Sequence, residues 1–257
     1  MPAPNTTPLT WNSYFQAVTT MMVVAVTTTA GVVVGVDADT NTVMPQALQY
    51  AELRIQRDLD LLPARTSRSY TLASGSNQLA LSSNDFIAVE TISVNPGTGY
   101  VPLQPASVEF LQNVYAPSST LGTPVYFAMY GGDLATGGNT SNLLLLGPPP
   151  AGNYATIVTG MTRLPSLYAF ANPASAATGA TFISTYYPDL LIQASMVFIA
   201  QFQRNFDATS NDPQMPGIYE SQYQTLAAAA KAENSRARFE ASAWTSKSSP
   251  ANATPNR

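Results

Sequence analysis

The chain has 257 residues, of which 45% are apolar and only 10% charged, with a net charge of −4 and neither cysteine nor histidine. The length allows a sizeable core, in one large domain or two small ones. The missing residue types exclude disulfides, thiolate metal sites and Ser-His-Asp or Cys-His catalysis, and the negative balance argues against a basic nucleic-acid-binding face.

The low charge also bears on partners. Average usage is about 25% charged residues, and a surface that falls far below it is poorly protected against association. This favours permanent protein partners. The alternative from composition is a neutral, Thr-rich secreted protein, although the N-terminal residues show no basic and apolar regions of a secretion signal.

The N-terminal part predicts two helices separated by a segment rich in valine and threonine. Thr10 is expected to cap the first helix, and an apolar stripe that ends before Pro63 predicts the second, with Thr42 as its cap. The run at 21–36 is shorter than the roughly 20 residues of a membrane span and favours strand over helix. We therefore expect a ribbon or loop at 23–42 that packs against a neighbouring subunit.

The second helix and the residues after it hold an unusual share of the charge. Four of the eleven Lys and Arg residues fall within residues 49–70, interleaved with three acidic residues. The seven residues are Glu52, Arg54, Arg57, Asp58, Asp60, Arg65 and Arg68. They are typical either of ion pairs within one helix, at i,i+3 or i,i+4, or of pairs with an adjacent subunit.

From residue 69 the hydrophobic period changes from helical to alternating. Six or seven short strands separated by turn formers are expected in about 100 residues, with a short helix near residues 105–115. Pro188 then opens a third helix, and Tyr219 and Tyr223 lie on the apolar face of a fourth that runs to about Glu240. The last residues form a polar, proline-bearing tail.

These elements predict an α+β fold in which N- and C-terminal helices form a bundle and an antiparallel β-sandwich or barrel is inserted between them. The expected domains are residues 1–66 and 169–240 for the bundle, 67–168 for the β-rich insertion, and 241–257 for a flexible tail.

No group of residues predicts chemistry. Asp37 and Asp39 lie in a turn that we interpret as solvated, and Asp58 and Asp60 point to different sides of a helix. The glycine pairs lack the lysine and the strand–helix order of a phosphate loop. Thirteen tyrosines and ten phenylalanines suit a sugar-binding face less well than core and subunit contacts. We therefore predict no catalytic residue, no metal site and no cofactor, and a function carried by surfaces.

The layout resembles the head-to-tail adaptor proteins of tailed bacteriophages, of which tail tubular protein A is the podophage form. The resemblance rests on the order of elements over nearly the whole chain. It also rests on "RIQRDLDLL" at 54–62 and on the closing pair "YPDLLIQASMVFIAQFQRNF" and "GIYESQYQTLAAAAKAENSRARF".

The resemblance implies a structural virion protein that is not an enzyme. It would be made in the cytoplasm of the bacterial host and placed in the neck of the virion as a dodecameric homo-oligomeric ring. Its partners would be the portal protein, a tail or nozzle protein, and genomic DNA that passes through the lumen without sequence-specific binding; no membrane is involved. The implied portal-docking residues are Arg236, Arg238, Phe239, Trp244, Lys247 and Arg257.

Two alternatives stay open. One is a tail-completion or tail-tube ring protein of a phage, which shares the same physical requirements. The other is a secreted carbohydrate-binding or adhesive β-sandwich protein, which the helices at both ends of the chain disfavour. In the adaptor interpretation, the charged segment would join neighbouring subunits of the ring.

Overall fold

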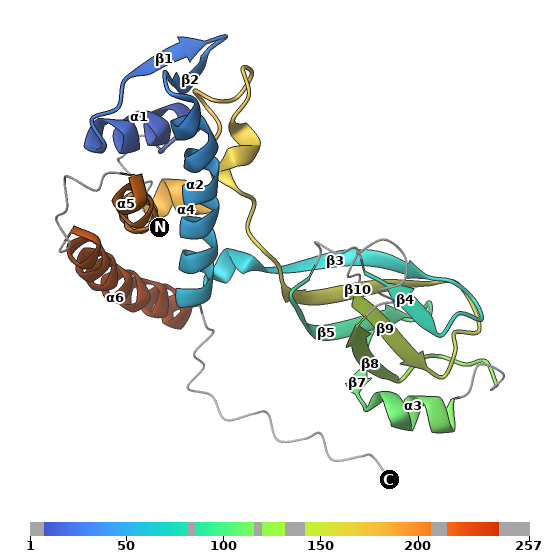
Figure 1. The fold of residues 1–257 in the computed structure, drawn as a ribbon. Helices are drawn as coiled ribbons and strands as arrows, with labels where there is room; N and C mark the ends of the chain where they lie inside the picture. The colour runs from blue at the N-terminus through green and yellow to red at the C-terminus, as the bar shows by residue number, and fades with distance from the viewer. Residues whose placement is uncertain (1–7, 82–85, 116–119, 132–141, 207–214, 242–257) are drawn as a thin grey trace. The chain divides into compact units, whose positions relative to one another are not determined.

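The structure is a computed structural model that describes residues 8–81, 86–115, 120–131, 142–206 and 215–241. The chain divides into two compact units, unit 1 from residues 1–62 and 166–257 and unit 2 from residues 63–165. Helices dominate unit 1 and strands dominate unit 2 (Figure 1). The fold is therefore α+β, as predicted.

Unit 1 is built around a central helix. Its helices are α1 (Trp11–Met21), α2 (Ala38–Asp58), α4 (Phe182–Tyr186), α5 (Pro188–Phe206) and α6 (Met215–Ala241), with a short 3-10 helix, η2, at Leu167–Phe170. Helix α5 contacts α1, α2, α4 and α6. Its described side chains are buried on several sides, which is the pattern of a core helix. Pro188 occupies its first position, where the missing N–H costs nothing.

Local signals place the starts of the N-terminal helices. Thr10 caps α1 as predicted, in a reciprocal capping box with Ser13. Helix α2 begins at Ala38, four residues before the expected cap at Thr42. The side chain of Asn41 explains the difference, because it bonds the N–H and carbonyl of Gly35 and the carbonyl of Asp37. These bonds tie the first turn of α2 to the residues that precede it, and the N-cap Asp37 makes no side-chain cap bond.

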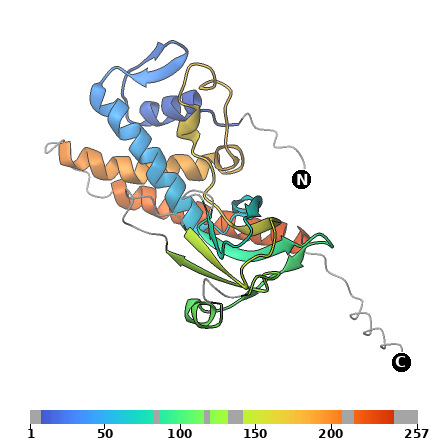
Figure 2. The ribbon, with the colours of Figure 1, turned by 90° about the vertical axis from the view of Figure 1, so that its right-hand side faces the viewer.

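The segment rich in valine and threonine is a β-hairpin. Strand β1 (Val26–Thr29) pairs antiparallel with β2 (Val32–Gly35), through a two-residue turn in which Ala30 and Gly31 both have positive φ. That is the turn geometry that matches the twist of a tight hairpin. Figures 1 and 2 show the hairpin beside the N-terminal end of α2. The ribbon predicted at 23–42 is thus a hairpin followed by the first turn of α2.

Val23, between α1 and the hairpin, has an unfavourable backbone conformation. Its φ is +57° and its side chain is 92% exposed. Its N–H donates to the carbonyl of Thr20 and that of Val24 to the carbonyl of Thr19. This is a Schellman ending, in which glycine normally takes Val23's place. A left-handed conformation costs a non-glycine residue roughly 1–2 kcal/mol.

We therefore expect Val23→Gly to raise the free energy of unfolding by about 0.5–1 kcal/mol, because relief of strain exceeds the entropy that glycine loses. Urea unfolding measures the change. Gln16→Gly, at an exposed position inside α1, is the matched control and should lower the same free energy by about 1 kcal/mol. Equal losses from both changes would show that Val23 is not strained.

Unit 2 contains two four-stranded sheets and one helix. One sheet has the order β3 (Arg65–Leu72), β10 (Tyr154–Met161), β5 (Ala88–Asn95), β6 (Val101–Pro102). The other has the order β4 (Gln78–Ala80), β9 (Asn142–Gly147), β8 (Tyr126–Gly131), β7 (Gln104–Pro105). Neighbours are antiparallel except β7 and β8. The consecutive strands β3 and β4, on either side of the turn at 75–77, belong to different sheets.

The two sheets enclose one core. It contains Leu72, Ile92, Val94 and Val158 from the first sheet and Phe127, Leu144 and Leu146 from the second. Leu145 points the other way and packs with Leu111 of α3 (Val108–Val114). The leucine run of β9 is therefore buried on both faces, which accounts for its lack of alternation. Unit 2 is a β-sandwich with a helix over one outer face.

Candidate interaction surfaces

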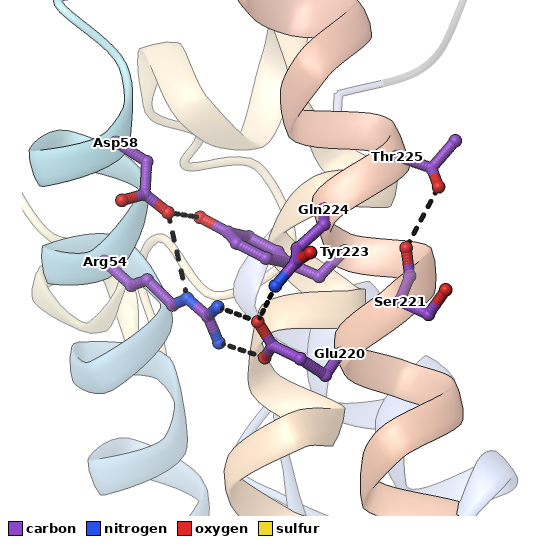
Figure 3. Close-up of polar contacts among 7 residues, drawn as sticks. All are labelled: Arg54, Asp58, Glu220, Ser221, Tyr223, Gln224 and Thr225. Atoms are coloured by element: carbon purple, nitrogen blue, oxygen red, sulfur yellow. Dashed lines mark hydrogen bonds and ion pairs between the residues drawn. The ribbon is translucent and has the colours of Figure 1, made fainter.

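The guanidinium of Arg54 joins α2 to α6 (Figure 3). Its two terminal nitrogens donate to the two carboxylate oxygens of Glu220, at 2.8 and 2.6 Å. The same group stacks on the ring of Tyr223, 4.0 Å from the ring centroid. Bidentate and stacked arginines are among the strongest polar contacts in proteins. We call Arg54, Asp58, Glu220 and Tyr223 the α2–α6 clasp.

Asp58 completes the clasp from the next turn of α2. Its Oδ2 accepts a 2.6 Å hydrogen bond from the Tyr223 hydroxyl and lies 3.8 Å from the Nε of Arg54. The Arg54 hydrogen bonds lower the pKa of Glu220, and burial, followed by the bond to Asp58, raises the pKa of Tyr223. Both shifts favour the protonation states that hold the clasp together at neutral pH.

Beside the clasp, α6 packs on α5. The buried side chains described on α6 are Tyr223, Ala227 and Ala230, on one face of the helix. One further polar contact lies beyond them, where the Asn234 side chain donates to the Asp60 carbonyl at 2.5 Å. Helix α6 packs mainly on α5, and the clasp adds a polar link from α6 to α2.

Glu52 lies on another face of α2 and is buried, with 4% of its surface exposed. Its Oε1 accepts a 2.7 Å hydrogen bond from the Leu167 N–H, at the start of η2. Burial raises the pKa of Glu52, and its bonds to Leu167 and Ser166 oppose that rise. The carboxylate thus fixes the point at which the chain re-enters unit 1.

Because the pKa of Glu52 is raised on folding, the folded state binds its proton more tightly than the unfolded state does. Stability attributable to this residue is therefore greatest at acidic pH and falls as pH rises through the raised pKa. Glu52→Gln keeps an acceptor for Leu167 and does not titrate. We expect the free energy of unfolding of the Gln variant, relative to that of the unchanged protein, to rise between pH 4 and pH 7. Urea unfolding at each pH measures this difference.

Glu52→Ala is the control for this prediction. It leaves the buried Leu167 N–H without its acceptor, so it should lower the free energy of unfolding by about 1–3 kcal/mol. A parallel pH dependence of the unchanged and Gln proteins would contradict the assigned role of burial.

The family to which the sequence belongs is clear from comparison with known proteins. The model of the SU10 adaptor protein family matches residues 19–251, which includes all of unit 2, most of unit 1 and the clasp. The chain belongs to this family of adaptor proteins. No curated protein matches the sequence. Membership makes the chain a structural phage adaptor and implies a place in the neck of the virion, with portal and tail as neighbours.

At least four of the seven charged residues predicted at a subunit interface make contacts within the described part of their own chain. Arg54 and Asp58 belong to the clasp, Glu52 is buried, and Arg65 pairs with Glu90 at 2.8 Å. Arg57, Asp60 and Arg68 are exposed. Arg57 has no ion pair with any residue in the described part of the chain. The interface itself stays a prediction, and Arg57 is its best remaining candidate.

Of the residues implied at the portal, Arg236 is exposed near the end of α6. Arg238 and Phe239 belong to the same helix, but their side chains lie outside the described ones. Trp244, Lys247 and Arg257 lie outside the described residues altogether. Docking by this segment also stays a prediction.

The described residues contain no group of three or more acidic residues placed to hold a metal ion. Within the same ranges, no helix is both long enough and apolar enough to cross a membrane.

The partners of Arg54 were missed by sequence reasoning. Its i,i+4 spacing to Asp58 was visible in the sequence, but Glu220 and Tyr223 lie more than 160 residues later. A tyrosine three residues after a glutamate on a helix was the available signal. It indicates two side chains on one face that can receive an arginine together.

Proposed function

We propose that this adaptor forms a twelve-fold ring that docks on the portal, receives the tail or nozzle on its other side, and lets DNA pass through its lumen. The family match over residues 19–251 carries the proposal. In this chain, helices precede and follow an inserted β unit. On the basis of this layout we propose that the adaptor is of the tail tubular protein A type.

The charge of the chain supports passage of DNA. Its net charge is −4 and only 10% of its residues are charged. A channel with few basic side chains neutralises few phosphates and so holds a polyanion weakly.

Native mass spectrometry of the adaptor, alone and mixed with the portal protein encoded by the same phage, tests the ring. Twelve adaptors on a portal ring are expected. A six-fold assembly without portal would favour a tail-tube or tail-completion protein instead. A monomer that ignores the portal would overturn the proposed ring.

Arg57→Ala tests the proposed subunit contact in the same experiment. An exposed arginine without an ion pair in the described part of its own chain is free to pair with a carboxylate of the next subunit. We expect weaker ring assembly and an unchanged thermal midpoint of the free protein. Arg65→Ala, which removes a pair within the chain, is the control. Unchanged assembly of the Arg57 variant would remove this residue from the interface.

Truncation after Ala241 tests the proposed docking segment. It removes Trp244, Lys247 and Arg257 while leaving the helix bounds of α6 intact. Loss of portal binding with retained folding is expected, and full portal binding by the truncated protein would contradict the assignment.

A further inference from the structure

The two edges of the β1–β2 hairpin differ in whether their outward backbone groups are hydrogen-bonded. On the β2 edge, the Asn12 side chain bonds the Gly31 carbonyl and the Val33 N–H, at 2.8 and 2.9 Å. The Asn41 side chain bonds both the N–H and the carbonyl of Gly35. Two asparagine side chains thus take the place of a third strand along β2.

The β1 edge has no such cover. The Val36 N–H donates to the Ala25 carbonyl, so that pair exchanges bonds inside the hairpin. Since hydrogen-bonded and non-bonded pairs alternate, Val26 and Thr28, opposite Gly35 and Val33, direct their N–H and carbonyl groups outward. No residue in the described ranges bonds these groups. Figure 1 shows β1 as the outer strand, and its contacts within the chain are mainly with β2.

The other outer strands carry features that discourage pairing. Strand β3 bears Arg65 and Arg68, β6 and β7 contain Pro102 and Pro105, and β4 has only three residues. Charges, prolines and short length are the usual ways in which proteins protect sheet edges. Strand β1 has no proline, and residues 21–36 contain no charged side chain. Its edge is open to another strand.

We propose that β1 pairs with β1 of a second copy of this chain, making a four-stranded sheet about a two-fold axis at Thr27. In an antiparallel pair centred on Thr27, Val26 faces Thr28 of the other copy, and all the outward groups of both residues are bonded. The sequence is therefore self-complementary in this register, and it places two threonines side by side, a favourable cross-strand pair.

Neighbouring registers are less favourable. In a register centred on Val26, the N–H of Val24 would have to bond the other copy, but it already donates to the carbonyl of Thr19. In a register centred on Thr28, Ala30 would have to pair as a strand residue, but its φ of +49° belongs to the turn. A two-fold contact uses the same surface on both copies, so it cannot close a ring. The pairing belongs to the free adaptor before assembly, and does not depend on the proposed ring.

Cysteine cross-linking of the full chain gives a clean test, because the sequence has no cysteine of its own. In the proposed pair the two Thr27 residues form a non-bonded pair with Cα atoms about 4.5 Å apart, within reach of a disulfide. Thr27→Cys should therefore form a covalent dimer with oxidised glutathione at least about tenfold faster than Thr29→Cys, whose partner is Ala25. Both threonines are exposed.

Thr28→Pro provides the second arm. It removes one outward N–H without touching the bonds between β1 and β2, a position where edge strands accept proline. We expect it to abolish the concentration-dependent dimer in sedimentation equilibrium and to leave the thermal midpoint unchanged. A chain that stays monomeric at all concentrations, a dimer that survives Thr28→Pro, or equal cross-linking at positions 27 and 29 would each overturn the pairing.

Discussion

Gly160→Ala is expected to lower the stability of unit 2 by about 2–3 kcal/mol or more, as overpacking of a closed interior does. Gly160 is buried in β10 beside a shift of register against β5. An added Cβ would collide with the Ala88 carbonyl oxygen and come within 3.0 Å of the Val89 Cα. Both are backbone atoms of a paired strand, so they cannot yield without breaking the ladder.

Hydrogen exchange of the amides in β5 and β10 measures this loss for unit 2 by itself. Gly152→Ala is the matched control. Its Cβ would meet its nearest neighbour, the Tyr154 ring, at an ordinary 3.5 Å. A change of less than about 0.5 kcal/mol is expected there. Similar effects of the two variants would mean that β5 and β10 adapt more easily than their register indicates.

Arg54→Ala is expected to lower the free energy of unfolding of unit 1 by about 2 kcal/mol, since it removes a bidentate ion pair and a stacked cation together. The loss should be concentrated in α6, whose amides should exchange faster than those of α5. Arg57→Ala, one turn further along α2 and exposed, should change the same free energy by less than about 0.5 kcal/mol.

A double-mutant cycle with Glu220→Gln isolates the ion pair from the stacking on Tyr223. A coupling of about 1–2 kcal/mol is expected at neutral pH. Because the pKa of Glu220 is lowered on folding, its contribution is present above the ordinary range of a glutamate and is lost as pH falls through the lowered value. Coupling that persists in strong acid would rule out the carboxylate as its source.

Local signals predicted the elements better than their partners. The sequence predicted the cap at Thr10, the helix start at Pro188 and the alternating strands. Caps, prolines and periodicity act over a few residues, so a short stretch of sequence is enough to recognise them. The start of α2 was misplaced because Asn41, inside the helix, bonds backward to Gly35. Residues of this kind cannot be recognised until the hairpin before them is known.

The contacts of Arg54 and Glu52 also divide into those that local spacing predicts and those that it does not. The spacing of Arg54 and Asp58 gave a true contact, but at 3.8 Å it is the weaker one, and the short bonds go to Glu220. Glu52 was expected at a surface because glutamate is seldom buried. Its burial depends on the return of the chain at Leu167, 115 residues later, which no local pattern contains.

The two ends of unit 2 meet at a single point. The Thr162 N–H and hydroxyl both donate to the carbonyl of Ala64, at 2.7 and 3.3 Å. A module that leaves and re-enters its host through adjacent residues can be exchanged or removed while the host keeps its chain path. The helical unit of this adaptor can therefore accept a different β unit between residues 62 and 166 without a change in its own chain path.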